Sequence, residues 1–165
     1  MRGIYVLLIN VEKDVDVTVG AKGRISFKKG LYSYVGSGQT NLEQRIRRHL
    51  RKKKQKFWHI DYLLSSGAAR IVKVFFKEAK KTEECTVAKT ICLKNKPILG
   101  FGCSDCKCES HLFYMQNFRS KRNYGELGRK NNTKFLHLFS PFSSNHWQEW
   151  KRSKLGLQKR KPRTG

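Results

Sequence analysis

Apolar and polar residues follow strand periods in the first part of the chain. Residues 3–10 form an almost continuous apolar run of strand length, which is typical of a central buried strand. Over residues 15–19 valines alternate with polar residues, as in a half-exposed strand. Two further strands are predicted over 24–27 and 31–35, with residues 28–30 as a hairpin connection between them. The N-terminal part is therefore predicted to be an antiparallel meander.

A helical pattern begins after the glycine-containing turn at residues 36–39. Thr40 and Glu43 form a capping-box pattern, which predicts a helix from this point to about Lys53. Three apolar residues recur at intervals of four and are expected to face the sheet. They are Leu42, Ile46 and Leu50.

The remaining pattern completes an α+β order. Helices are predicted over residues 57–64 and 82–93, with a last strand over 71–76 between them. We therefore expect a small antiparallel sheet, a meander with an inserted hairpin, flanked by about three helices. Periodicity is lost near Phe118, which predicts a domain over 3–115.

Residues 116–165 are predicted to be a basic, flexible C-terminal extension. From residue 119 onward thirteen Lys and Arg face only two acids. Aromatic residues are interspersed: Phe135, Phe139, Phe142, Trp147 and Trp150. Such a mixture could stack on unpaired bases while it binds phosphates. It could equally be a disordered segment that contributes only nonspecific charge.

Charge restricts the partners of the whole chain. Thirty-six Lys and Arg against twelve Asp and Glu give a net charge of +24, which favours a nucleic acid partner. No apolar stretch approaches the roughly 20 residues needed to span a bilayer, so no membrane partner is expected. Five cysteines and no cleavable leader indicate a reducing, cytoplasmic location, associated with the nucleoid if the cell lacks a nucleus.

Three short motifs carry a family resemblance. Gly3-Ile4-Tyr5 and Tyr34-Val35-Gly36 lie on predicted strands, and Arg45 and His49 lie one turn apart on the predicted helix. Together they resemble the GIY-YIG nuclease superfamily. The chain is most similar to a domain-of-unknown-function branch with a long insert between the two motifs, a Trp-His-Ile-Asp-Tyr segment and a late stretch containing Cys and His. The resemblance covers residues 3–115 and implies a GIY-YIG-like fold.

The chemistry expected from this resemblance is hydrolysis of DNA phosphodiester bonds. Arg45 suits the charge-holding role, since its planar, permanently charged fork matches two phosphate oxygens. The alternative is that it is one more solvated residue of a basic run. The rest of that run is expected to contact nucleic acid, with DNA favoured over RNA. It comprises Arg47, Arg48, Arg51, Lys52, Lys53, Lys54 and Lys56.

Tyr5, Tyr34 and His49 are the candidates for handling the proton of the attacking water. A phenol has an unperturbed pKa of about 10, too high for a base unless cations such as nearby arginines stabilise the phenolate. His49, with an unperturbed pKa of about 6.5, is a second candidate base. The alternatives are ordinary packing for the tyrosines and a surface hydrogen bond for the histidine.

Acidic residues are scarce, which narrows the search for a metal ligand. The resemblance implies that Glu84 binds Mg²⁺ or Mn²⁺, although Glu83 differs from it by a single position. Acids in a first helical turn also simply complement the helix dipole. Asp61 could be a second acid of the site, or it could pair with an arginine or cap a helix, and His59 could simply bond a backbone carbonyl.

Cys103, Cys106, Cys108 and His111 form a compact set of soft donors. Four such donors within nine residues could hold Zn²⁺. The alternatives are reduced cysteines packed in a turn and a redox-active thiol pair. Cys85 and Cys92 are expected to be small core residues on a helix and poor ligands.

Three functions are compatible with these patterns. The first is a metal-dependent endonuclease acting on DNA, including structure-specific or repair-related cleavage. The second is a noncatalytic nucleic-acid-binding module with the same fold. The third is a zinc-stabilised interaction module in which the cysteine loop is the contact surface.

Overall fold

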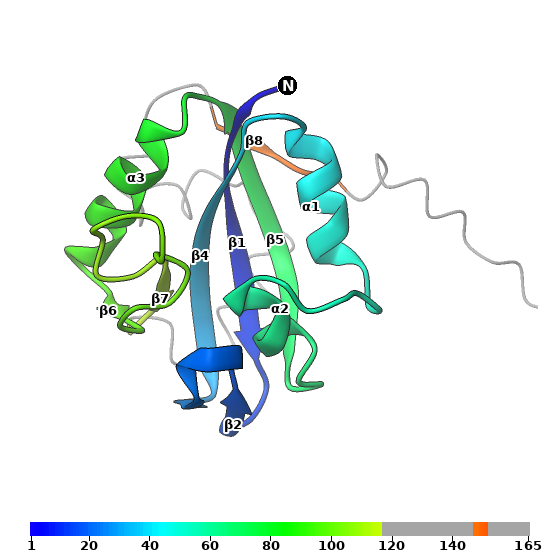
Figure 1. The fold of residues 1–165 in the computed structure, drawn as a ribbon, viewed down its shortest axis with the longest axis vertical. Helices are drawn as coiled ribbons and strands as arrows, with labels where there is room; N and C mark the ends of the chain where they lie inside the picture. The colour runs from blue at the N-terminus through cyan, green and yellow to red at the C-terminus, as the bar shows by residue number, and fades with distance from the viewer. Residues whose placement is uncertain (117–146, 152–165) are drawn as a thin grey trace, which may run out of the picture.

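The computed structural model describes residues 1–116 and 147–151, and Figure 1 shows their arrangement. The strands are β1 (Gly3–Val11), β2 (Val15–Thr18), β3 (Arg24–Phe27), β4 (Gly30–Gly38), β5 (Ala69–Glu78), β6 (Lys96–Pro97), β7 (Leu112–Tyr114) and β8 (Gln148–Glu149). The helices are α1 (Leu42–Leu50), α2 (His59–Leu64) and α3 (Thr82–Cys92), with a 3-10 helix η1 (Gly20–Lys22). The main sheet is antiparallel in the order β6-β7-β4-β1-β5-β8, and β2 and β3 form a separate two-stranded sheet. The predicted α+β class is confirmed.

The central strand, β1, is buried on both faces. One set of alternate residues packs with α1, α2 and the β2–β3 hairpin, and it consists of Tyr5, Leu7, Ile9 and Val11. The other set packs with α3 and consists of Ile4, Val6 and Leu8. In Figure 1 α1 and α2 lie on one side of the sheet and α3 lies on the other. Because successive side chains of a strand point to opposite faces, burial of both faces requires the continuous apolar run seen in the sequence.

The strand pairing differs from the predicted meander. β3 pairs with β2, with Val15 opposite Phe27, and β4 pairs along its full length with β1. The predicted hairpin at residues 28–30 is therefore wrong, and these residues connect the two sheets. Periodicity can locate a strand but does not choose its partner, and here the almost fully buried β4 satisfies its backbone groups against the almost fully buried β1.

Helix α1 begins one residue later than predicted and ends earlier. Its N-cap is Asn41, not Thr40, and the Asn41 side chain accepts a hydrogen bond from the backbone N–H of Gln44 at 3.0 Å. It ends at Leu50 rather than near Lys53, since the basic residues that follow offer no apolar side chain to pack against the sheet. None of the helices in the described part of the chain has the length and apolarity needed to cross a membrane.

Helices α2 and α3 and strand β5 are close to those predicted, with small shifts at their ends, but β5 is not the last strand as predicted, because the short strands β6, β7 and β8 follow it. α2 starts two residues after the predicted position, and α3 ends within one residue of it. β5 is longer than predicted because it pairs with β1 over almost the whole length of that strand.

Part of the expected C-terminal extension belongs to the sheet. Gln148 and Glu149 pair with β5, and the ring of Trp150 lies 5.5 Å from that of Phe76. Trp147 packs against the core on the α3 side. Backbone pairing and aromatic burial thus attach residues 147–151 to the domain, contrary to the predicted boundary. The remainder of the expected extension, with Phe135, Phe139 and Phe142, lies outside the described residues.

A buried carboxylate joins α1 to the start of α2. Asp61 is completely buried, and it accepts hydrogen bonds from Arg48 at 2.8 and 3.0 Å and from the backbone N–H groups of Phe57 and Trp58 at 2.9 Å. Burial alone would raise the pKa of Asp61, but these hydrogen bonds lower it below its usual value. Asp61 is therefore a charged anchor of the fold.

We expect Asp61→Asn to destabilise the domain by about 3 kcal/mol, because it leaves buried donors without their charged acceptor. Asp16 is the matched control. It pairs with Arg24 on the exposed hairpin, and Asp16→Asn should leave the unfolding midpoint nearly unchanged. Urea unfolding of both variants measures the difference, and equal losses would contradict the anchoring role.

Candidate functional site

A pocket of about 410 Å³ gathers the residues of the sequence motifs. Tyr5 comes from β1, Tyr34 from β4, Arg45 from α1 and Glu84 from α3, and all four line its wall. They are widely separated in the sequence. The structure therefore brings together four of the five residues that the sequence identified as catalytic candidates.

The glycines of the two strand motifs make room for this arrangement. Gly36 lies opposite Tyr5 in the β1–β4 register, and a Cβ atom at Gly36 would lie 2.3 Å from the Tyr5 hydroxyl oxygen. A Cβ atom at Gly3 would lie 2.2 Å from the backbone oxygen of Lys77. Since real Cβ contacts are never this short, any larger residue at Gly36 displaces the Tyr5 ring, and any at Gly3 disturbs the β1–β5 contact.

His49, the fifth candidate, is buried beside Tyr5 rather than in the pocket wall. Its Nε2 atom lies 2.6 Å from the Tyr5 hydroxyl oxygen, and its side chain is 2% exposed. Burial, with a further contribution from Lys54, lowers the pKa of His49 to about 3. The imidazole is therefore neutral near pH 7, and its geometry suits holding the Tyr5 hydroxyl rather than serving as a second base.

The two tyrosines remain protonated at neutral pH. Burial raises the pKa of Tyr5 well above its ordinary value, and the neighbouring Tyr34 raises it further. Burial and then Glu84 also raise the pKa of Tyr34. Arg45 lowers both values but is outweighed, so the expected stabilisation of a phenolate by nearby arginines is wrong for this pocket. In the described part of the chain the Tyr34 hydroxyl has no hydrogen-bond partner, and it is available to a molecule in the pocket.

Arg45 is the arginine of α1 whose charge is not neutralised by an acid. Its Nη1 atom donates to the backbone oxygen of Ser37 at 2.7 Å, and its guanidinium carbon lies 4.7 Å from the centre of the Trp58 ring. No acid among residues 1–116 and 147–151 pairs with it. By contrast, Arg47 pairs with Glu43 and Arg48 pairs with Asp61. Arg45 thus keeps both its charge and several N–H donors for a pocket ligand.

The basic run after Arg45 divides into internal and exposed residues. The Arg48 guanidinium holds Asp61, and the Lys54 ammonium donates to the backbone oxygen of His49. Both side chains therefore stabilise the fold. The exposed members, which remain available to a polyanion, are Arg51, Lys52, Lys53 and Lys56.

Of the two adjacent glutamates, only Glu84 lines the pocket. Its carboxylate is 14% exposed, and Oε1 lies 2.9 Å from Nδ1 of His111. Glu83 instead pairs with Lys77 at 2.6 Å, with a 44% exposed side chain. The geometry therefore favours Glu84 over the neighbouring position, and one carboxylate oxygen stays available for a hard cation.

Three further residues, Asp61, His59 and Asp105, differ in their relation to the pocket. Asp61 does not line the pocket, so its interpretation as a second site acid is wrong. His59 does line it, and its Nδ1 atom accepts from the backbone N–H of Gly102 at 3.0 Å rather than bonding a carbonyl. Asp105 was not among the candidates, yet it lines the pocket and pairs with Lys81 at 3.0 Å. In the sequence, only the position of Asp105 directly before Cys106 could have pointed to it.

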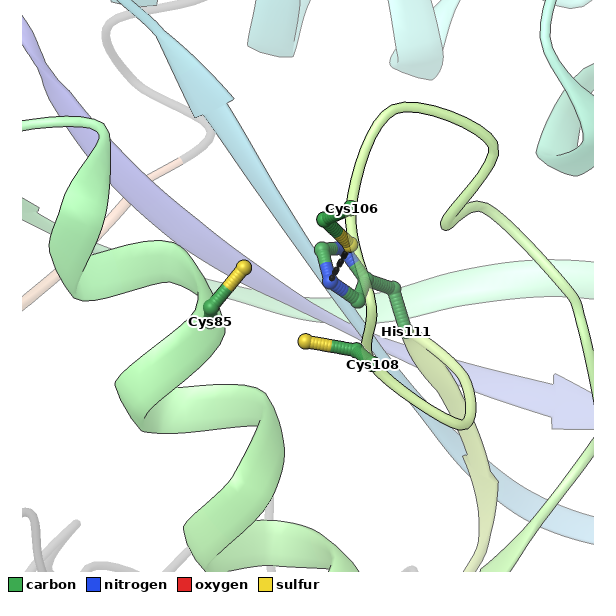
Figure 2. A group of neighbouring side chains, drawn as sticks. All are labelled: Cys85, Cys106, Cys108 and His111. Atoms are coloured by element: carbon green, nitrogen blue, oxygen red, sulfur yellow. Dashed lines mark hydrogen bonds between the residues drawn. The ribbon is translucent and has the colours of Figure 1, made fainter.

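A second cluster lies next to the pocket and could hold a metal ion. The ligand atoms of Cys85, Cys106, Cys108 and His111 all lie within 4.8 Å of one another, and Figure 2 shows the side chains converging from α3 and the loop. Cys103 does not take part, since its Sγ atom faces the backbone oxygen of Glu109 at 3.8 Å. The predicted set is thus corrected at one position. The loop alone supplies three of the four donors of this cluster. The fourth donor is Cys85 on α3, which was expected to be a poor ligand.

These features define a small α+β domain with a pocket lined by tyrosine, arginine and glutamate beside a candidate metal-binding cluster. The chain belongs to the family described as domain of unknown function DUF123, whose sequence model matches residues 4–132. The match continues past the domain end expected at residue 115. Comparisons with curated proteins and with solved structures find no match.

The buried His49 is expected to make the fold sensitive to acid. Its pKa is about 3 in the folded chain against an ordinary 6.5, so the unfolded chain binds the extra proton between these values. Stability from this residue is complete above pH 6.5 and is lost as pH falls, by about 2 kcal/mol at pH 5.

His49→Gln retains hydrogen-bonding capacity toward Tyr5 without titrating, so it should lose less stability between pH 7.5 and pH 5 than the native chain. Denaturant unfolding at the two pH values measures this. His59→Gln, at a less buried histidine whose pKa burial also lowers, is the control and should retain most of the native acid sensitivity. An unchanged pH dependence in His49→Gln would contradict the prediction.

Proposed function

We propose that this chain is a divalent-metal-dependent endonuclease that hydrolyses DNA phosphodiester bonds and is related to the GIY-YIG nucleases. The observation that carries the proposal is the single pocket lined by Tyr5, Tyr34, Arg45 and Glu84. These residues match the motifs of the resemblance and come from four separate elements. Hydrolysis of a phosphodiester needs a held phosphate, an oriented water and a stabilised leaving oxygen, and this pocket contains side chains suited to each task.

Arg45 is assigned to the phosphate. Its permanent charge has no acidic partner in the described residues, and its planar fork can donate to two phosphoryl oxygens at once. The exposed basic residues 51–53 follow the same helix and would extend the contact along the nucleic acid backbone. Because such contacts read charge and shape, backbone recognition is expected to dominate over base recognition.

Glu84 is assigned to the divalent cation. Mg²⁺ and Mn²⁺ prefer oxygen ligands, and Mg²⁺ typically binds only one or two carboxylates because it keeps several of its waters. The donor set of the pocket fits that requirement, since the Glu84 carboxylate is partly exposed and only one of its oxygens faces His111. When bound, such an ion would supply charge stabilisation to the leaving oxygen.

The tyrosines are assigned to the attacking water. Both are protonated at neutral pH, so their hydroxyl groups would orient water through hydrogen bonds rather than act as preformed bases. The Tyr34 hydroxyl is free to do so directly. The Tyr5 hydroxyl is fixed by His49 at 2.6 Å, which makes His49 a positioning residue.

An aromatic side chain at the pocket favours nucleic acid with unpaired bases. Phe57 lines the pocket, is 78% exposed, and contacts Trp58 edge to face at 5.5 Å. An exposed ring beside a phosphate site can stack on an unstacked base, which supports flaps, junctions or damaged sites as substrates.

The two metal sites of the proposal differ in chemistry. Oxygen donors at Glu84 suit Mg²⁺ or Mn²⁺, whereas three thiols and an imidazole suit Zn²⁺. The Cys/His cluster is therefore assigned to Zn²⁺ and not to the ion of the reaction.

Glu84→Gln should reduce metal-dependent cleavage by about 10²-fold or more, because it removes the charged oxygen ligand while keeping the shape of the side chain. Glu83→Gln is the matched control on the same helical turn and should keep near-native activity. End-labelled single-stranded, duplex, flap and junction DNA with Mg²⁺ or Mn²⁺ provide the assay. Equal activity of the two variants would exclude the assignment of Glu84.

Arg45→Lys should also reduce cleavage by about 10²-fold while DNA binding falls only a few-fold, since Lys keeps the charge but lacks the fork. Arg51→Lys, on the exposed side of the basic run, should change neither. Cleavage rates and binding isotherms at the same salt concentration separate the two effects. Tight, salt-sensitive binding by the native chain without turnover on any substrate would instead favour the noncatalytic nucleic-acid-binding module.

A further inference from the structure

The Cys/His cluster and the pocket share a connection that the proposed reaction does not use. Cys85 follows Glu84 directly on α3, and the other three donors lie in the loop between β6 and β7. His111 contacts both groups, because its Nδ1 atom is 2.9 Å from Glu84 and its Nε2 atom is 3.5 Å from Cys106 Sγ. The imidazole therefore lies between the thiols and the carboxylate.

The distances within the cluster are close to those of a tetrahedral zinc site. Zn–S bonds of about 2.3 Å and Zn–N bonds of about 2.0–2.1 Å at tetrahedral angles place sulfur and nitrogen about 3.6 Å apart. The Cys106 Sγ to His111 Nε2 distance of 3.5 Å agrees with this value. No two ligand atoms of the cluster are more than 4.8 Å apart, against about 3.8 Å between two zinc-bound sulfurs, so closure requires inward shifts of at most about 1 Å.

The nitrogen atoms of His111 are arranged as in a metal-ligating histidine. Such a histidine binds the ion with one ring nitrogen and donates its other N–H to a carboxylate, which fixes both the tautomer and the ring. Here Nε2 faces the thiols, and Nδ1 lies 2.9 Å from Glu84 Oε1, a close contact whose angle does not yet meet hydrogen-bond geometry. The His111 side chain is 1% exposed, so the ring has little freedom to adopt another partner.

We propose that Cys85, Cys106, Cys108 and His111 bind one structural Zn²⁺, and that His111 thereby positions the Glu84 carboxylate at the pocket. Four protein ligands leave no open coordination position, as in structural rather than catalytic zinc sites. The zinc site stands independently of the proposed function, whereas the consequence for cleavage rests on it.

Bound zinc would also hold in place the loop that forms one wall of the pocket. The loop that carries Cys106 and Cys108 supplies Gly102, Ser104 and Asp105 to that wall. Its exposed link to α3 is the Lys81–Asp105 pair, with both side chains more than 60% exposed, and pairs of this kind contribute little. A metal that bridges α3 and the loop joins them far more strongly.

The first test measures metal in the full-length chain purified without chelator and supplied with Zn²⁺. Elemental analysis should find one zinc per chain. Replacement by Co²⁺ should give the strong visible absorption of tetrahedral Co²⁺ together with thiolate charge-transfer bands. Absence of bound zinc, an octahedral Co²⁺ spectrum, or loss of two thiols to a disulfide under mild oxidation of the zinc-supplied chain would each overturn the proposal.

The second test identifies the ligands. Cys85→Ser should lower zinc affinity at least about tenfold. Cys92→Ser is the matched control on the same helix, and Cys103→Ser is the control within the loop; both should keep the metal. Retention of native zinc affinity by Cys85→Ser, or loss of zinc from Cys103→Ser, would overturn the ligand set. If Cys85→Ser does not fold, the Co²⁺ spectrum of Cys103→Ser decides the donor set, because it keeps the native thiolate charge-transfer intensity only if Cys103 is not a ligand.

The third test examines the link through His111 with a readout that needs no cleavage. Removal of a carboxylate that supports a ligating histidine typically weakens metal binding by 10- to 100-fold. Glu84→Ala should therefore weaken zinc binding by about tenfold or more in competition with a chromogenic chelator, whereas Glu83→Ala should not. Equal zinc affinities would overturn the link. These results hold with or without nuclease activity, so failure of the zinc proposal and failure of the proposed function remain distinguishable.

Discussion

Burial of both faces of β1 is the constraint on which the rest of the structure depends. A nine-residue strand with apolar side chains on each face needs a cover on each side, and α1 with α2 supplies one while α3 supplies the other. Its two backbone edges are satisfied by β4 and β5 over nearly their whole length. Once these partners are fixed, Tyr5 faces the α1 side, and the start of α3 brings Glu84 to the same pocket.

The same burial decides the charges within the pocket. Tyr5, Tyr34 and His49 are removed from water, and each is held in its neutral form because desolvation disfavours the charged one. The charged side chains that line the pocket are Arg45, Glu84, Lys81 and Asp105, of which the last two pair with each other. The pocket therefore combines neutral hydroxyl groups with charged side chains of both signs.

The pocket and the Cys/His cluster form one connected region rather than two separate features. The contact between His111 and Glu84 joins them, and consecutive residues of α3 contribute to each. A change in the cluster could therefore reach the pocket through the Glu84 carboxylate and through the loop residues that line it. Soft donors in the cluster thus lie beside oxygen donors in the pocket, and the two sets favour different classes of metal ion.

The sequence by itself determined the α+β class, the positions of most strands and helices, and the residue types of the pocket, because periodicity and motif residues are local properties of the chain. It did not determine that β4 pairs with β1 rather than with β3, or that the N-cap is Asn41. It left open whether Asp61 joins the site or pairs with an arginine, and it did not show that His49 is buried or that Cys85 rather than Cys103 completes the cluster. Each of these features depends on which distant segments come into contact and how much water they exclude. The packing of β1 between α1 and α2 on one face and α3 on the other determines both.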